Sequence, residues 1–177
     1  MNLEPHDIPD LAMLSENDQI REVYAWAGRA LYYAQVLEYG LVNLMHVVFG
    51  TGGNLADEFS TVDEFLEVYF RKTLGRLANE VRQLDVLDRA TEDQLDEALR
   101  RRNFLAHSFF KDRAELFVRQ EGCRLMLIEL RDATELFISA DFAVTEALYA
   151  MGAPVGLTRE AAEESACKLR GTTGLIT

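Results

Sequence analysis

Apolar residues recur every three or four positions through most of the chain, which is the spacing of one face of an α-helix. The clearest example is the segment 18–49, with apolar positions at Ile20, Val23, Ala27, Ala30, Ala34, Leu37, Leu41, Leu44, Met45 and Val48. Gly50, Gly52 and Gly53 follow directly, and glycine commonly ends a helix. The pattern predicts one long amphipathic helix over residues 18–49.

Two capping boxes mark the next helices. The sequence "TVDE" at Thr61 is typical of a helix start, and the pattern then continues to about Leu84. Gly75 within this segment indicates a close helix contact or a kink. A second box, "TEDQ" at Thr91, predicts a third helix that ends at about His107.

A fourth helix is expected to begin at the potential cap Asp112 and to continue to about Met151, with an interruption at Gly122. The sequence "GAPVG" then breaks the pattern, and "LTREAAEESACKL" predicts a short amphipathic helix after it. The only prolines, Pro5, Pro9 and Pro154, lie outside the middle of the chain. This distribution favours long helices.

These elements predict an all-α protein, an antiparallel bundle of four to five helices over residues 18–151. Residues 1–17 form an N-terminal extension, and residues 152–177 form a C-terminal extension with the short helix. The N-terminus has no basic segment followed by an apolar core, and no apolar run reaches the roughly twenty residues that span a bilayer. We therefore expect a cytoplasmic protein without a membrane segment.

The sequence gives no pattern for a metal or another cofactor. Di-iron bundles use Glu-x-x-His pairs, but the residues three before His46 and His107 are Asn43 and Phe104. Cys123 and Cys167 lack metal-ligand spacing and are expected to be reduced thiols. The sequence "GTGGN" lacks the Lys-Ser/Thr ending of a phosphate loop. His46 is interpreted as a hydrogen-bonded core or interface histidine.

Charge is unevenly distributed along this acidic chain. The net charge is −12, yet residues 100–113 contain five basic residues and one acid, a net charge of +4 that leaves −16 for the other 163 residues. A local basic site in an acidic protein suits a small anionic target held at one place. The alternative is a solvated basic helix end, whose charges complement the helix dipole.

Within this basic stretch, helical spacing gathers a polar set. Asn103 and His107 are four residues apart and share a face, which Arg100, seven before His107, also joins. Arg102 lies about 140° around the helix from His107 and would need its long side chain to reach the same site.

The sequence "RNFLAH" at residues 102–107 resembles the Arg-x(4–6)-His signature of the HEPN superfamily. This resemblance implies a HEPN-like helical bundle that forms a homodimer, and many HEPN proteins are metal-independent ribonucleases of toxin–antitoxin, phage-defence and RNA-processing systems. The expected substrate is then RNA, and a toxin would have an antitoxin protein as a further partner. Arg100, Arg101 and Arg102 all satisfy the spacing, although Asn103 favours Arg102. Phe109 stands where a common toxin subgroup has tyrosine.

The residue chemistry suits RNA cleavage. Histidine is a residue type that transfers protons in catalysis, so His107 can act as acid or base, Arg102 can stabilise charge on the phosphorane, and Asn103 can orient the imidazole. Arg100, Arg101 and Lys111 are the expected phosphate-binding residues. One histidine cannot easily be acid and base in the same step, so an enzyme of this kind needs a dimer.

The apolar run 123–130 is apolar on more than one face, which also predicts a subunit interface. Two alternatives remain. One is a non-catalytic HEPN-like bundle that binds a protein or a nucleotide, and the other is an acidic helical interaction protein whose motif is only a helix end.

Overall fold

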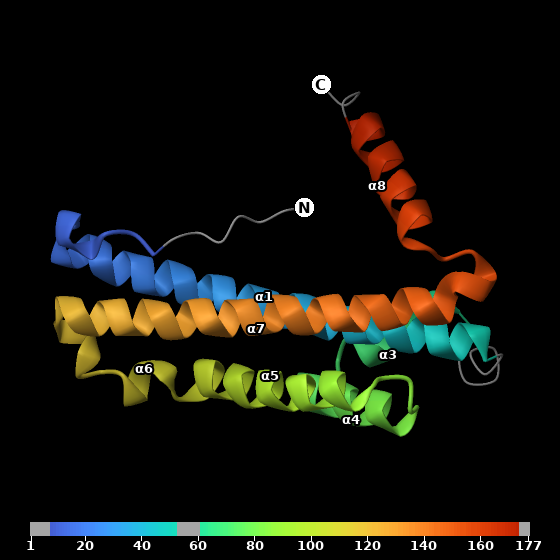
Figure 1. The fold of residues 1–177 in the computed structure, drawn as a ribbon, viewed down its shortest axis with the longest axis horizontal. Helices are drawn as coiled ribbons and strands as arrows, with labels where there is room; N and C mark the ends of the chain where they lie inside the picture. The colour runs from blue at the N-terminus through green and yellow to red at the C-terminus, as the bar shows by residue number, and fades with distance from the viewer. Residues whose placement is uncertain (1–7, 53–60, 174–177) are drawn as a thin grey trace. The chain divides into compact units, whose positions relative to one another are not determined.

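A computed structural model describes residues 8–52 and 61–173, and helices are the only regular secondary structure among them. The predicted all-α class is confirmed. The α-helices are α1 (Glu16–Thr51), α3 (Val62–Tyr69), α4 (Leu74–Gln83), α5 (Arg89–His107), α6 (Phe109–Asp112), α7 (Gln120–Gly152) and α8 (Arg159–Thr173) (Figure 1). Short 3₁₀ helices occupy Leu11–Met13 (η1), Leu116–Val118 (η2) and Ala153–Val155 (η3).

The chain forms two compact units, each made of two separate stretches. The first contains Met1–Leu37 and Ala90–Asp141, and the second contains Glu38–Arg89 and Phe142–Thr177. The helices α1 and α7 each contribute to both units, because the divisions fall within them.

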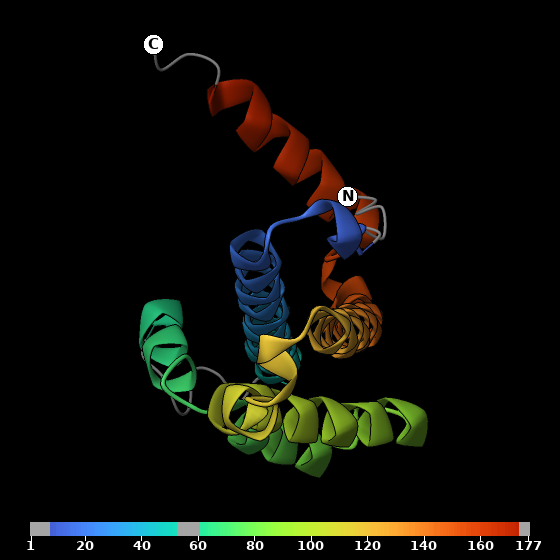
Figure 2. The ribbon, with the colours of Figure 1, turned by 90° about the vertical axis from the view of Figure 1, so that its left-hand side faces the viewer.

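In the first unit, α1, α5 and α7 lie next to one another (Figure 2). Most of their buried side chains are periodic apolar positions of the sequence: Val23, Ala27, Ala30, Ala34 and Leu37 from α1, Leu95, Ala98 and Leu105 from α5, and Cys123, Met126, Leu127, Leu130, Ala133, Phe137 and Ala140 from α7. A hydrogen bond from Gln94 Nε2 to Ser139 Oγ, 2.8 Å long, joins α5 to α7 at the edge of this core. Burial of one apolar face per helix therefore holds the unit together.

The predicted fourth helix begins later than expected. The chain first forms α6 and η2, and α7 begins only at Gln120, so Gly122 lies in its first turn instead of interrupting it. Gly122 is required by a close approach, since a Cβ atom there would lie 2.0 Å from the backbone oxygen of Leu116. The glycine lets η2 fold directly against the start of α7.

In the second unit, an aromatic cluster joins α1 to α3. The rings of Phe65 and Tyr69 stack with centroids 4.2 Å apart, and the ring of His46 lies 5.2 Å from that of Phe65. His46 is half-buried, and its buried Nδ1 has no hydrogen-bond partner in the described chain. The prediction that His46 is hydrogen-bonded is therefore wrong at this atom.

The second predicted helix is two helices, α3 and α4, and the break lies at residues 70–73, before Gly75. Lys72 stabilises this turn because it contacts both helices. Its Nζ lies 2.6 Å from a carboxylate oxygen of Glu80 on α4 and 3.5 Å from the centroid of the Tyr69 ring on α3. The capping box at Thr61 is confirmed at its first residue, whose side chain accepts a hydrogen bond from the N–H of Glu64 at 3.1 Å.

The third predicted helix, α5, begins at Arg89, so Thr91 lies within its first turn and is not its cap. The short helix expected near the C-terminus is α8. Arg159 at the start of α8 pairs with Glu146 of α7, and its guanidinium lies 5.2 Å from the centroid of the Tyr149 ring.

One described helix, α7, is long and apolar enough to cross a membrane by length and composition, with an 18-residue window of mean hydropathy 1.3. The core helices of soluble proteins meet the same criterion. Only 22% of that window is buried within the chain, and one such helix is weak evidence for a membrane span, so the structure is compatible with a soluble protein. The expectation of a cytoplasmic protein stays a prediction.

Asp141 is a half-buried carboxyl group on α7. Its helix neighbours Phe137 and Ala140 are fully buried, and its own side chain makes no hydrogen bond or ion pair with the described residues. Burial raises the pKa of Asp141 to about 6, because a low-dielectric environment disfavours the charged form.

Candidate functional site

The last turn of α5 carries the predicted catalytic residues. His107 is its final residue, and Ser108, with φ −129° and ψ −24°, departs from helical geometry before α6 begins. The side chain of His107 is exposed and makes no hydrogen bond or ion pair with the described residues. Its imidazole is therefore available to a molecule from outside this chain.

Arg102 and Asn103 are brought together by a direct contact. Nη1 of Arg102 donates a hydrogen bond to Oδ1 of Asn103 at 3.3 Å, and Asn103 is four residues before His107 on the same side of α5. By its helical position alone, Arg102 would point away from the face that carries Asn103 and His107. Its long, half-buried side chain nevertheless contacts Asn103. Within one chain, His107 makes no polar contact with either residue.

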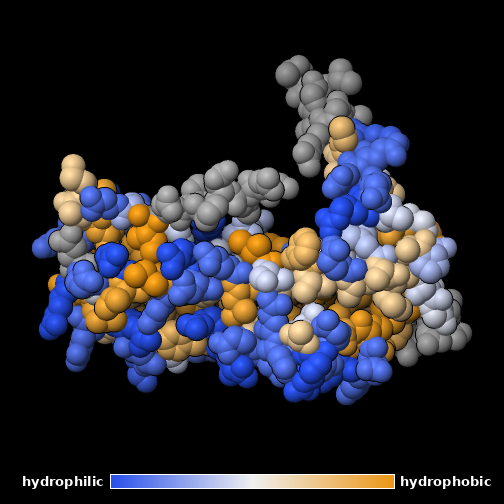
Figure 3. All heavy atoms as spheres, viewed as in Figure 1, coloured by the Kyte–Doolittle hydropathy of each residue, from blue (hydrophilic) through white to orange (hydrophobic). Residues whose placement is uncertain are grey.

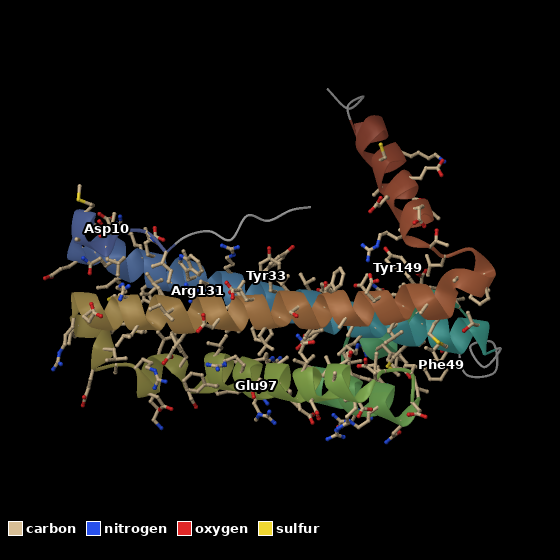
Figure 4. All side chains as sticks on the ribbon, in the orientation of Figure 1. Asp10, Tyr33, Phe49, Glu97, Arg131 and Tyr149 are labelled. Carbon is tan, nitrogen blue, oxygen red and sulfur yellow. The ribbon has the colours of Figure 1, made fainter. Side chains whose placement is uncertain are left out.

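The predicted phosphate-binding residues fall into two groups. Nη2 of Arg100 lies 2.8 Å and Nη2 of Arg101 lies 3.8 Å from the carboxylate of Glu97, which is labelled on α5 in Figure 4. Lys111, on α6, is exposed and has no ion-pair partner in the described chain. Exposed ion pairs are worth about 1 kcal/mol or less, so both arginines can exchange Glu97 for a phosphate.

Arg113 is tied more firmly to an acid. Its guanidinium makes a bidentate contact with Glu129 of α7, with Nε and Nη2 each 3.0 Å from a carboxylate oxygen. This hydrogen bonding raises the pKa of Arg113 above its ordinary value. Much of the +4 in this stretch is therefore balanced by Glu97 and Glu129, which the linear charge count does not show.

An exposed aromatic cluster lies beside the motif, and the sequence analysis missed it. The ring of Phe110 lies 5.5 Å from that of Tyr24 and 5.9 Å from that of Phe117, between centroids. Phe109, which replaces the subgroup tyrosine, is fully buried. The pair "FF" after His107 was the only local signal, because Tyr24 reaches the cluster from a distant part of the chain.

Two hollows of about 320 Å³ lie in the first unit. One is lined by Ile8, Pro9, Asp10, Leu11, Ala12, Glu121, Arg124, Ile128 and Arg131. The other is lined by Glu16, Gln19, Ile20, Phe117, Val118, Arg119 and Cys123. Neither of these two hollows is lined by Arg102, Asn103 or His107. Residues 8–52 and 61–173 also show no group of three or more metal-binding side chains.

Comparisons with known proteins do not assign a family. No family model, curated protein or solved structure matches the chain. The resemblance of residues 102–107 to the HEPN signature stays a prediction, and the function is argued from the geometry of the residues themselves.

Proposed function

We propose that this protein is a metal-independent endoribonuclease of the HEPN type, active as a cytoplasmic homodimer. One observation carries the proposal: exposed His107 has no hydrogen-bond or ion-pair partner among the described residues, and it shares the end of α5 with the bonded pair Arg102–Asn103. An unpaired imidazole can accept or donate a proton near neutral pH. A guanidinium and an amide beside it supply the donors that a phosphate needs.

The cleavage step uses two copies of His107. The 2′-oxygen of a ribose attacks the adjacent phosphorus while its proton passes to His107 of one subunit. The bond from phosphorus to the 5′-oxygen breaks, and His107 of the second subunit protonates that oxygen. The products are a 2′,3′-cyclic phosphate and a 5′-hydroxyl end. Arg102 stabilises the negative charge of the phosphorane that forms on the way from substrate to products.

Apolar residues exposed on α7 support the dimer. Within the run 123–130, Cys123, Met126, Leu127 and Leu130 are buried in their own unit, whereas Leu125 is 44% exposed. Hydrophobic residues also reach the surface farther along α7, where Phe142 is 58% exposed (Figure 3). A second copy that covered such residues would bury apolar area, which favours association.

The biological role that suits such an enzyme is the toxin or effector of a toxin–antitoxin or phage-defence system. An antitoxin protein would then be the partner that blocks the motif surface.

A second candidate is a non-catalytic HEPN-like module that binds a protein or a nucleotide. The pairing of Arg100 and Arg101 with Glu97 favours it, because those cations already have a partner within the chain. Such a module would keep the Arg102–Asn103 contact for structure alone.

Cleavage of single-stranded RNA in the presence of EDTA separates the two candidates. We expect wild-type protein to cleave, and His107→Ala or Arg102→Ala to reduce the rate by about 10²-fold or more. Asn103→Ala should reduce the cleavage rate by a smaller factor. Arg21→Ala is the matched control, since it removes an exposed arginine of α1 that pairs only with Asp18 in the described chain.

Folding and assembly are checked in the same proteins. The motif variants should unfold within about 1 kcal/mol of wild type, because the side chains lie at a helix end. Light scattering should give a dimer at micromolar concentration, and a monomer would contradict the two-histidine step. Consistent absence of cleavage, or normal cleavage by His107→Ala, would instead favour the binding module.

A further inference from the structure

Three aromatic rings from three elements meet at the surface of the first unit. Tyr24 of α1, Phe110 of α6 and Phe117 of η2, here called the aromatic platform, have centroid separations of 5.5, 5.5 and 5.9 Å. Tyr24 is 55% exposed and Phe110 is 40% exposed, and Phe117 is half-buried. Tyr24 and Phe110 therefore remain partly accessible although the rings are in mutual contact.

The platform is held in place from below. Phe109 is fully buried, and its ring lies 5.2 Å from that of Phe110 and 5.9 Å from that of Phe104. A buried aromatic ring in this position limits the rotation of its exposed neighbour. Binding to a surface that is already ordered costs less conformational entropy than binding to a mobile one.

The platform lies close to the proposed catalytic residue along the chain. Phe110 follows His107 by three positions, and the break between α5 and α6 at Ser108 lies between them. Both side chains are exposed, so His107 and the platform residue Phe110 lie on the surface of one short segment of the chain.

Unpaired cations flank the platform. Lys111 is the next residue after Phe110, and Arg119 follows η2 directly; both are exposed and have no ion-pair partner in the described chain. Three acids lie near these cations: Asp112 and Glu115 are close to Lys111 in sequence, and Glu16 lines the same hollow as Arg119. Lys111 is next to Phe110 in sequence and Arg119 lines the same hollow as Phe117, so both can contact phosphates of a strand whose base rests on the rings.

A hollow adjoins the platform at Phe117 and contains a polar acceptor. Gln19 lines this hollow of about 320 Å³ and is only 6% exposed. Its Nε2 donates to the backbone oxygens of Leu11 and Leu14 at 2.9 and 3.1 Å, which fixes the amide orientation. Its Oε1 receives no hydrogen bond from the described residues and remains for an outside donor.

We propose that the aromatic platform stacks one unpaired base of a single-stranded RNA, and that the next base enters the hollow, where an exocyclic amino group donates to Gln19 Oε1. Aromatic side chains that stack on bases, together with cations that follow the backbone, are how proteins hold single strands. Bases in a duplex are already stacked on one another, so the platform selects single-stranded segments. This inference rests on the proposed function, because it defines the substrate of the same enzyme.

The test separates stacking from cleavage by the use of RNA that cannot be cut. A 2′-O-methyl single strand that contains 2-aminopurine is titrated with wild type, Tyr24→Leu and Phe110→Leu, each of which keeps an apolar side chain but loses the ring. We expect wild type to quench the fluorescence, and the variants to bind about 5- to 100-fold more weakly with reduced quenching. Phe110→Trp should retain quenching, and a duplex of the same sequence should bind weakly.

The matched control is Tyr39→Leu. Tyr39 is also 55% exposed and also touches one phenylalanine ring, that of Phe70 at 5.1 Å, but it belongs to the second unit. Its variant should bind the single strand as wild type does. Equal losses in Tyr39→Leu and Tyr24→Leu would overturn the assignment of the platform.

Each remaining outcome decides between the two proposals. Full binding and quenching by Tyr24→Leu and Phe110→Leu would overturn stacking, while EDTA-resistant cleavage of unmodified RNA would leave the enzyme intact. Quenching by a wild type that never cleaves would overturn the enzyme and support the platform as an RNA-binding surface. A dimer that becomes monomeric in Tyr24→Leu would show that a second copy covers the rings, which overturns stacking. A wild type that binds no RNA overturns both.

Discussion

Asp141 should make the protein less stable at neutral pH than an uncharged residue in its place. The pKa of this carboxyl group is raised from 3.8 to about 6 by burial, so the folded state holds the proton more tightly than the unfolded state does. Protonation of Asp141 therefore contributes to the stability of the folded state. This contribution is fully present below about pH 4 and is lost as the pH rises through about 6. At 1.36 kcal/mol per pH unit the difference would approach about 3 kcal/mol, and partial solvent exposure reduces it to about 1–2 kcal/mol.

The substitution Asp141→Asn removes this charge with little change in volume. We expect it to stabilise the protein by about 1–2 kcal/mol at pH 7.5 and to have almost no effect at pH 4, as measured by urea unfolding followed by circular dichroism. The matched control is Asp132→Asn on the same helix, where the carboxylate is exposed and lies 2.9 Å from Arg131. That variant should gain nothing at neutral pH. A less stable Asp141→Asn at pH 7.5, or a difference that stays constant with pH, would refute the argument and indicate a partner for the carboxylate.

Other substitutions test single contacts. Gly122→Ala should lower the free energy of unfolding by more than about 2 kcal/mol, because its Cβ would meet the backbone of η2. Gly28→Ala on α1 should raise it by about 0.5–1 kcal/mol, because its Cβ would meet nothing within 4 Å. Urea unfolding of both variants is the check. His46→Leu should be neutral or stabilising in thermal melts, since an unsatisfied buried nitrogen costs about 1–3 kcal/mol, and a marked loss would reveal a hidden partner. Arg102→Lys should cleave RNA faster than Arg102→Ala but at least about tenfold slower than wild type, because an ammonium cannot make bidentate phosphate contacts; equal rates for lysine and arginine would contradict this role.

The helices were predictable where a single periodic face decides their burial. The long helix α1 was expected over 18–49 and extends over Glu16–Thr51, because its apolar positions are regular and glycines follow it. The break between α3 and α4 was not predicted, since it depends on Lys72, whose contacts to Glu80 and Tyr69 exist only after both helices fold. The late start of α7 was missed for a similar reason, because the role of Gly122 is visible only beside Leu116.

For the candidate site, helical spacing correctly placed the motif at the end of α5 and is consistent with the pairing of Arg100 with Glu97, but it could not show partners from other helices. The acids that pair with Arg100 and Arg113 are Glu97, one turn earlier on the same helix, and Glu129, on another helix. The aromatic platform depends on Tyr24, which is far from Phe110 in sequence. A charge count or a motif does not contain tertiary contacts of this kind. Helical spacing predicts only which positions share a face, from which such contacts can form.

The division of α1 between the two compact units has a consequence for synthesis on the ribosome. The stretch up to Leu37 belongs with Ala90–Asp141, so it emerges before the 52 residues Glu38–Arg89 that belong elsewhere. At about 5–20 residues per second, its apolar face waits for about 3–10 seconds before α5 begins to appear, and longer for α7. During that interval the nascent chain displays an uncovered hydrophobic stripe, so early folding of this protein should depend on chaperones more than its modest length suggests.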